Sequence, residues 1–185
     1  MMEDKKLIQA CREGDLDQFK KIVDKYGAQS MALAMNILGN REDAQDASQE
    51  TFLQVFRNLS RFDADRNFKT WLFTILTRRC FDRLKKRRRF AAFFFKMKNE
   101  NWEERNGRII IRLTNPSLRN QSLSQNLLEI LSPKERTALC LWANEGYTAV
   151  EISRALRCTA STARVYLFNA RRKIRAVMEK RNVRL

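Results

Sequence analysis

The spacing of apolar residues is the feature that most limits the fold of this chain. They recur three and four positions apart along nearly all of the 185 residues, the period of a helix face rather than the alternation of a β-strand. Five glycines and two prolines leave few points at which helices break. The sequence therefore predicts an all-α fold of two small helical domains, at residues 1–89 and 123–185, joined by a flexible linker at 90–122.

Turn and capping residues divide the first domain into helices. Asp15 and Gln18 form a capping-box pattern at the start of one helix, and Gly39 ends it. A polar loop follows the next helix, and the third helix ends in a basic run. The predicted helices cover residues 16–38, 42–59 and 68–89, with the loop at 60–67.

The segment from Phe90 to about residue 122 lacks this regularity. It is first aromatic and basic, then polar, and its run RIIIRL at 108–113 has no neighbour with which to pair as a strand. Helical signals return at Leu123. Ser132 and Thr148 then each begin a capping box, and Gly146 lies where the helix between them should end.

The composition indicates a partner of opposite charge. Lys plus Arg number 37 against 21 Asp plus Glu, which gives a net charge of +16 and favours polyanions, with nucleic acid first and an anionic membrane surface second. No apolar run approaches the length of about 18 residues that spans a membrane, so we expect a soluble, cytoplasmic protein. Four scattered cysteines and no histidine argue against a zinc site, a cofactor and histidine-dependent catalysis.

The carboxy-terminal segment carries the clearest functional motif. Its sequence, YTAVEISRALRCTASTARVYLFNARRKIR, predicts a helix, a turn at 157–159 and a longer helix from about Ala160, the spacing of a helix-turn-helix. Apolar residues from Ala163 to Val177 share one stripe, which leaves a basic face outward with Phe168 on it, suited to a thymine methyl. The predicted base readers are Ser161, Thr162, Arg164, Val165, Phe168 and Asn169, with Arg171, Arg172 and Arg175 on the DNA backbone.

The helix predicted from Phe68 begins with aromatic residues set among basic ones. Phe68, Trp71 and Phe73 alternate with Lys69 and polar residues. Aromatic faces beside a positive track bind single-stranded bases, because stacking contributes about 1–3 kcal/mol per base. The same aromatic residues would also fit a helical core, and their spacing leaves both interpretations open. Further along the helix lie Thr74, Thr77, Arg78, Arg79, Asp82 and Arg83.

The helix predicted over 42–59 is acidic in an otherwise basic chain. One stripe of it is apolar, which turns Asp43, Asp46, Gln49 and Glu50 outward. The carboxylates repel one another slightly at these spacings. The row is either a solvated face or a docking face for a basic protein surface, whose cations would relieve that repulsion. The stripe predicted to be buried comprises Ala44, Ala47, Thr51, Phe52, Val55, Phe56 and Leu59.

Taken in order, these segments resemble the small two-domain sigma factors of bacterial RNA polymerase, the extracytoplasmic-function (ECF) group of the sigma-70 family. The resemblance is carried by NREDAQDASQETFLQVFRNLSRF and FKTWLFTILTRRCFDRLKKRRR in the first domain, and by LSPKERTALCLWANEGYTAVEISRALRCTASTARVYLFNARRKIR in the second. The chain departs from the family pattern at Arg78, Arg157 and Asn169, where members often carry Asn, Gly and a basic residue.

The resemblance implies a transcription initiation subunit with no catalysis of its own. It would bind core RNA polymerase through the clamp helices of the largest subunit and promoter DNA in both duplex and single-stranded form. The loop at 60–67 would cover the pocket for a flipped base, and the linker would pass near the polymerase active site. The free protein would be a monomer without membrane contact, and whether an anti-sigma factor binds it stays open.

The resemblance also assigns roles to residues. Those implied for polymerase docking are Asp43, Asp46, Gln49, Glu50 and Leu53. Those implied for the melted downstream element are Phe68, Lys69, Trp71, Arg78, Asp82 and Arg83, and those for the upstream duplex element are Ser161, Thr162, Arg164, Val165, Phe168, Asn169, Arg171 and Arg172.

Two other classes of protein share parts of this pattern. A stand-alone helix-turn-helix regulator would need the second domain alone and would have no use for outward carboxylates at Asp46 and Glu50. A recombinase or nuclease with a helix-turn-helix tail is disfavoured by the lack of histidine, of a metal-ligand cluster and of a glycine-rich phosphate loop in the sequence, although the spacing leaves a serine nucleophile open.

Overall fold

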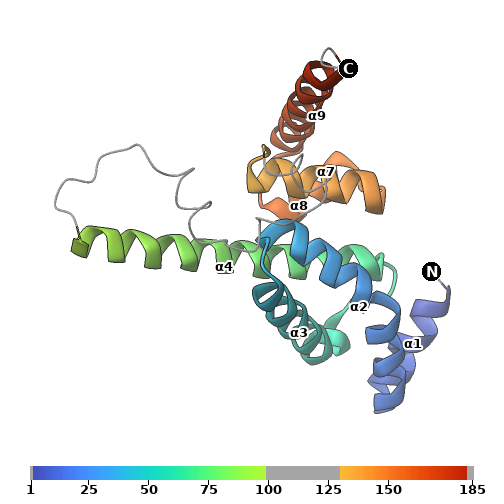
Figure 1. Ribbon diagram of the computed structural model, residues 1–185. Coiled ribbons are helices and arrows are strands. Elements are labelled where there is room, and N and C mark those ends of the chain that lie inside the picture. Colours follow the sequence, from blue (N-terminus) through green and yellow to red (C-terminus); the bar gives the residue numbers. More distant parts are fainter. Residues whose placement is uncertain (1, 99–129, 183–185) are drawn as a thin grey trace.

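The structure is a computed structural model, and it describes residues 2–98 and 130–182. Every regular element in these two ranges is a helix, which confirms the all-α prediction. Helices α7, α8 and α9 lie together on one side of α2 and α4, while α1 and α3 lie on the other side (Figure 1). The elements are α1 (Met2–Arg12), α2 (Leu16–Leu38), α3 (Arg41–Asn58), the 3-10 turn η1 (Leu59–Arg61), α4 (Phe68–Lys98), α7 (Pro133–Glu145), α8 (Ala149–Leu156) and α9 (Ala160–Asn182).

The predicted caps form the ends of α2. The Asp15 carboxylate accepts hydrogen bonds from the backbone N–H groups of Asp17 and Gln18 at 3.0 and 3.3 Å. Gly39 ends the helix with a φ of 66°, the left-handed conformation that favours glycine. Helix α1 was not predicted, and its Ile8 is buried in the core beside α2.

Helix α3 buries the predicted stripe with one exception. Ala44, Ala47 and Val55 are fully buried, and the Thr51 hydroxyl donates to the backbone oxygen of Ala47 at 2.7 Å. Phe56 was expected in the core but is 41% exposed. Its ring instead makes an edge contact with Phe19 of α2, at a centroid distance of 4.9 Å, near the rim of the bundle.

Helix α4 is longer than the sequence predicted. It does not end at Arg89 but continues to Lys98 and projects beyond the bundle (Figure 1). Extending an existing helix costs little compared with nucleating one, and Ala91 and Ala92 are strong helix formers. Phe90 and Phe93 on this extension are 64% and 60% exposed. The possible strand at 108–113 and the helix start at Leu123 lie outside the described residues.

The second domain has the predicted helix-turn-helix. Ser132 and Thr148 both form complete capping boxes, with Glu135 and Glu151 reaching back to the cap backbone. Gly146 ends α7 with a φ of 68°. The turn between α8 and α9 passes through Arg157, a non-glycine residue with a φ of 51°.

The two domains pack against each other. Helix α8 contacts α4, and α7 contacts α2. Buried residues from both domains, such as Leu76 and Ile152, belong to one continuous hydrophobic core. We call this packing of α7 and α8 on α2 and α4 the closed arrangement.

The left-handed turn makes a prediction about stability. A side chain in this conformation costs about 1–2 kcal/mol relative to glycine, part of which glycine loses again through its greater freedom in the unfolded chain. Arg157→Gly should therefore raise the free energy of unfolding by about 0.5–1 kcal/mol in urea denaturation. Arg175→Gly, in the exposed interior of α9, should lower it by about 1 kcal/mol. A decrease for Arg157→Gly would mean that its side chain stabilises the turn.

Candidate nucleic-acid and partner interfaces

The recognition helix α9 presents the predicted reading face to solvent. Phe168 and Val165 are 63% and 53% exposed, whereas Ala163 and Ala170 on the opposite stripe are fully buried. Ser161 and Arg164 are also exposed. Thr162 is half-buried and takes part in the cap, because its backbone N–H donates to the Thr159 hydroxyl at 3.1 Å. The geometry leaves an aromatic and polar surface available at the amino-terminal half of the helix.

Two arginines of α9 lie over aromatic rings. The Arg172 guanidinium is 5.8 Å from the centroid of the Phe168 ring, and that of Arg171 is 4.0 Å from the centroid of Trp142 on α7. Such contacts orient a cation without removing its charge. Trp142 was not singled out from the sequence, because only the tertiary fold brings α7 beside this part of α9.

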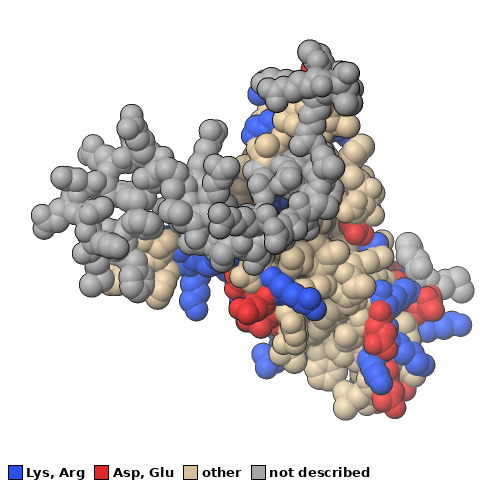
Figure 2. Space-filling model, in the orientation of Figure 1, with Lys and Arg blue, Asp and Glu red and all other residues tan. Residues whose placement is uncertain are grey.

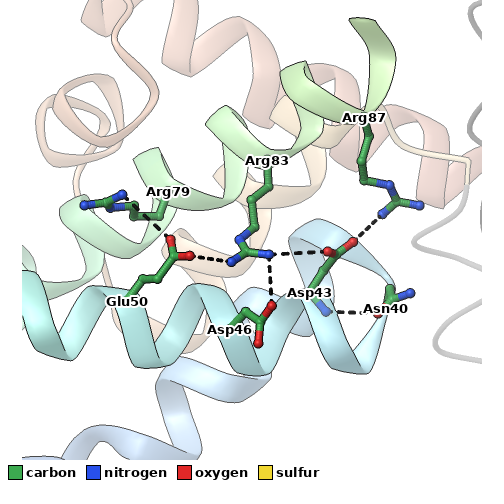
Figure 3. Close-up of polar contacts among 7 residues, drawn as sticks. All are labelled: Asn40, Asp43, Asp46, Glu50, Arg79, Arg83 and Arg87. Carbon is green, nitrogen blue, oxygen red and sulfur yellow. Dashed lines mark hydrogen bonds and ion pairs between the residues drawn. The ribbon is translucent and has the colours of Figure 1, made fainter. Parts of the chain in front are cut away.

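The acidic residues of α3 face arginines of α4. Residues Arg79, Arg83 and Arg87 are four apart and so lie along one side of α4, opposite the outward carboxylates (Figure 3). The Arg83 guanidinium is 2.6 Å from Glu50, 3.3 Å from Asp46 and 3.5 Å from Asp43. We call these six residues, Asp43, Asp46, Glu50, Arg79, Arg83 and Arg87, the charge ladder.

The charge ladder changes the interpretation of the acidic face. Burial alone would lower the pKa of Arg83, but the hydrogen bond to Glu50 and the neighbouring carboxylates outweigh it, so the pKa is raised. The three carboxylates and the three guanidiniums of the charge ladder carry equal and opposite charge. The repulsion among the carboxylates that the sequence indicated is therefore relieved within the chain. Arg83 was predicted for the melted element, and its guanidinium contacts Glu50 of α3 in this structure.

The rest of the predicted docking face is exposed. Gln49 and Leu53 point outward from α3 and have no partner among the described side chains, and Leu53 is 56% exposed. Asp46 and Glu50 are exposed as well, while Asp43 is half-buried beneath Arg87. All five predicted docking residues therefore lie on one helix, and the charged ones are held in place by α4.

The aromatic residues at the start of α4 are largely internal. Phe68 is 3% exposed and Phe73 is fully buried, which supports the core interpretation for both in this arrangement. Trp71 is half-buried and lies on the Phe62 ring at a centroid distance of 4.6 Å. Together with Tyr26, whose ring centroid is 5.7 Å from that of Phe68, these rings form what we call the aromatic cluster. Its members are Tyr26, Phe62, Phe68 and Trp71.

The second domain covers the basic residues predicted to follow the melted strand. The Lys69 ammonium is 2.6 Å from the Glu145 carboxylate of α7, and the Tyr147 hydroxyl donates to the Lys69 carbonyl at 3.2 Å. Arg78 donates to the carbonyl of Arg154 in α8 at 3.0 Å. Burial, and then the nearby charge of Arg157, lower the pKa of Arg78.

These contacts between domains were not visible in the sequence. Glu145 and Tyr147 flank Gly146, and their sequence pattern is that of ordinary residues at a helix end. Only the packing of the second domain on α4 brings them to Lys69. Of the residues predicted for the melted element, Asp82 is exposed, whereas Lys69 and Arg78 contact residues of the second domain. In the closed arrangement the predicted DNA-melting face is not available as a whole.

The described residues provide neither a metal site nor a membrane span. Within residues 2–98 and 130–182, no three His, Cys, Asp or Glu side chains group as a metal ion would require. None of the helices in these ranges has both the length and the apolar character needed to cross a bilayer. Basic and acidic side chains are instead interleaved over α1 and its surroundings (Figure 2), where Lys25 pairs with Glu3 and Lys5 with Asp65.

Comparison with known proteins gives the family. The Sigma-70 region 2 model matches residues 22–90 and the Sigma-70 region 4 model matches residues 125–174, together well over half of the chain. The chain belongs to the sigma-70 family and, within it, to the ECF sigma factors.

Individual relatives agree with this assignment. The ECF sigma factor SigW of Bacillus subtilis is 39% identical over 84 residues, which is 45% of this chain and 45% of that protein, so the match spans less than half of SigW. RNA polymerase sigma-H factor of Pseudomonas aeruginosa is 28% identical over 182 residues, 93% of this chain and 92% of that protein. The second match extends across both domains.

Solved structures share the fold. The sigma factor RpoE of Bartonella quintana, in complex with the anti-sigma factor NepR, has a TM-score of 0.66 at 21% identity and covers 87% of this chain and 96% of that one. CnrH in complex with the cytosolic domain of CnrY has a TM-score of 0.61 at 20% identity, with 96% and 98% covered. These identities support a common architecture.

The Lys69–Glu145 pair makes the closed arrangement testable. Glu145→Lys replaces the ion pair with two ammonium groups close together, a loss of about 2 kcal/mol for a partly buried pair, which should shift the equilibrium between closed and separated domains roughly 30-fold. The shift would appear as lower energy transfer between dyes on the two domains of the full-length chain.

A charge swap provides the control. Lys69→Glu combined with Glu145→Lys should restore most of the energy transfer, and Glu179→Lys on the exposed end of α9 should leave it unchanged. If the swap behaves like the single variant, this ion pair does not hold the domains together.

Proposed function

We propose that this chain is a sigma factor that binds core RNA polymerase and directs promoter recognition and opening. The observation that carries the proposal is the presence in one chain of matches to both family regions, with an exposed face on α3 and an exposed face on α9. Members of the family are not enzymes, and the chemistry of RNA synthesis belongs to the core polymerase.

Docking would use the outward face of α3. Gln49 and Leu53 are exposed and could contact the polymerase without giving up another contact, whereas Asp46 and Glu50 already contact Arg83. A basic clamp helix of the polymerase would share or replace these contacts, since surface ion pairs are worth only about 0–1 kcal/mol each. The charge ladder would thus hold the carboxylates in a fixed orientation before the polymerase arrives.

Promoter opening would use α4 and the loop before it. Trp71 is a partly exposed aromatic residue at the start of α4, and base stacking on such a side chain offsets part of the cost of unpairing DNA. Lys69 and Arg78 would contact the melted DNA only after α7 and α8 have moved away from α4. We therefore propose that polymerase binding accompanies separation of the two domains.

The second domain would read duplex DNA through α9. Phe168, Val165 and Arg164 lie on the exposed amino-terminal half of this helix, which is the part that meets base edges in helix-turn-helix complexes. We expect Arg172, beside Phe168, to contact the phosphates. A stand-alone regulator is less well supported, because it would leave the region 2 match at residues 22–90 without a role.

An anti-sigma factor is a further proposed partner. One solved structure with this fold is the sigma factor RpoE in complex with the anti-sigma factor NepR, and another is CnrH in complex with the cytosolic domain of CnrY. A protein that stabilised the closed arrangement would keep Lys69 and Arg78 covered and so would prevent promoter opening without touching α9.

The docking role can be tested with substitutions that remove charge but keep shape. Asp46→Asn with Glu50→Gln should lower affinity for bacterial core RNA polymerase about tenfold, from two ion pairs of about 0.7 kcal/mol each. Asp17→Asn with Asp24→Asn, on exposed positions of α2, removes the same charge and should have little effect. Fluorescence anisotropy of the labelled full-length chain measures both. Equal losses in the two variants would indicate general electrostatics rather than a docking face.

The opening role can be tested at Trp71. Trp71→Ala should spare core binding but reduce the permanganate reactivity of melted thymines about tenfold, because one stacked base is lost. The template would be a promoter identified by run-off transcription of genomic fragments with the wild-type holoenzyme. Full thymine reactivity in the variant would contradict the assignment.

A further inference from the structure

We propose that Arg12, the last residue of α1, is a positioning residue for promoter opening, because it holds the loop whose Phe62 ring packs against Trp71 of α4. The inference rests on the proposed function for its consequence but not for its geometry. Helix α1 precedes residue 22, where the match to Sigma-70 region 2 begins. The family comparison therefore assigns α1 no role.

Arg12 links α1 to both ends of the turn η1. Its Nε donates to the carbonyl of Leu59 at 3.1 Å, and its Nη2 donates to the carbonyl of Phe62. The Leu59 carbonyl also accepts the backbone N–H of Phe62 at 3.2 Å, so Arg12 donates to its second lone pair. Carbonyls at the end of a helical turn carry partial negative charge, which attracts a guanidinium. The planar fork of a guanidinium can satisfy two of them at once, which a lysine ammonium cannot do with the same geometry.

Phe62 connects this anchor to Trp71. The Phe62 ring is 5% exposed, lies 4.6 Å from the Trp71 ring at an interplanar angle of 33°, and meets the edge of Phe68 at 5.5 Å. Its backbone is held by Arg12 and its side chain supports Trp71. A displacement of the loop would therefore move the surface that supports the indole.

Helix α1 also reaches the other end of the aromatic cluster. The hydroxyl of Tyr26 donates to the Asp4 carboxylate at 3.0 Å, and Tyr26 packs on Phe68. Burial and this hydrogen bond raise the pKa of Tyr26 to about 12, so the hydroxyl stays protonated as the donor at neutral pH. The aromatic cluster is thus fixed to α1 at two points, the Tyr26 side chain and the Phe62 backbone.

A fixed support for Trp71 matters because a mobile side chain must lose conformational freedom before a base can stack on it. Preorganisation lowers that cost and increases affinity without a new contact. Arg12 contacts the loop at 60–67 through the backbone carbonyl of Phe62, whereas the charge ladder and α9 are held by other contacts. Its loss should therefore impair opening while leaving core binding and duplex recognition intact.

The first measurement reports on Trp71 directly. In a full-length chain with Trp102→Phe and Trp142→Phe, Trp71 is the sole tryptophan, since the sequence contains three. Arg12→Gln should increase acrylamide quenching of its emission about twofold, with Arg12→Lys in between. Lys6→Gln, which removes a charge from the same helix, should match the parent.

The second measurement uses the holoenzyme and a promoter opened by the wild-type protein. Arg12→Gln should slow open-complex formation about fivefold at unchanged core affinity, and Arg12→Lys should recover part of the rate. Unchanged quenching and opening would overturn the proposal, as would a loss of opening matched by an equal loss of core affinity. If the wild-type protein opened no promoter, the proposed function would fail, whereas the quenching result would still decide whether Arg12 positions Trp71.

Discussion

The burial of α4 against two sets of helices is the constraint on which the structure depends. Leu72 and Leu76 are fully buried in the core that α4 shares with α2 and α3, and α8 packs against the same helix. One rigid element therefore carries the arginines of the charge ladder, the aromatic residues before the basic track, and the contact between domains. The partner face on α3 is held by side chains of α4, and the covered DNA face lies on α4 itself.

The sequence predicted the features that depend on neighbours three or four residues apart. The caps at Ser132 and Thr148, the left-handed glycines at helix ends and the exposure of Phe168 are all of this kind. Helix periodicity and capping are local physics, so the all-α class and the reading face of α9 could be derived without coordinates. The family resemblance, confirmed by the two region matches, rested on the order of these segments.

The features that the sequence did not predict depend on residues far apart in the chain. Arg83 fits a basic track beside DNA by spacing, and only the packing of α4 on α3 shows that it meets Glu50. Phe56 follows the buried stripe, yet it is 41% exposed and its ring meets that of Phe19 on α2. The roles of Arg12 and Glu145 could not be predicted from local sequence patterns. Their partners, Leu59 and Lys69, lie 47 and 76 residues away in the chain. The end of α4 was misjudged because an aromatic and basic run resembles a linker but does not stop a helix.

The contact between domains also has a consequence for its response to ionic strength. It combines an attraction, Lys69 with Glu145, and a repulsion, Arg78 near Arg157, and dissolved salt screens both. The two effects oppose each other, so the closed arrangement should change little as salt rises. Phosphate contacts behave differently, because their affinity falls steeply through lost counterion release. A rise in salt concentration would thus weaken DNA binding far more than domain closure.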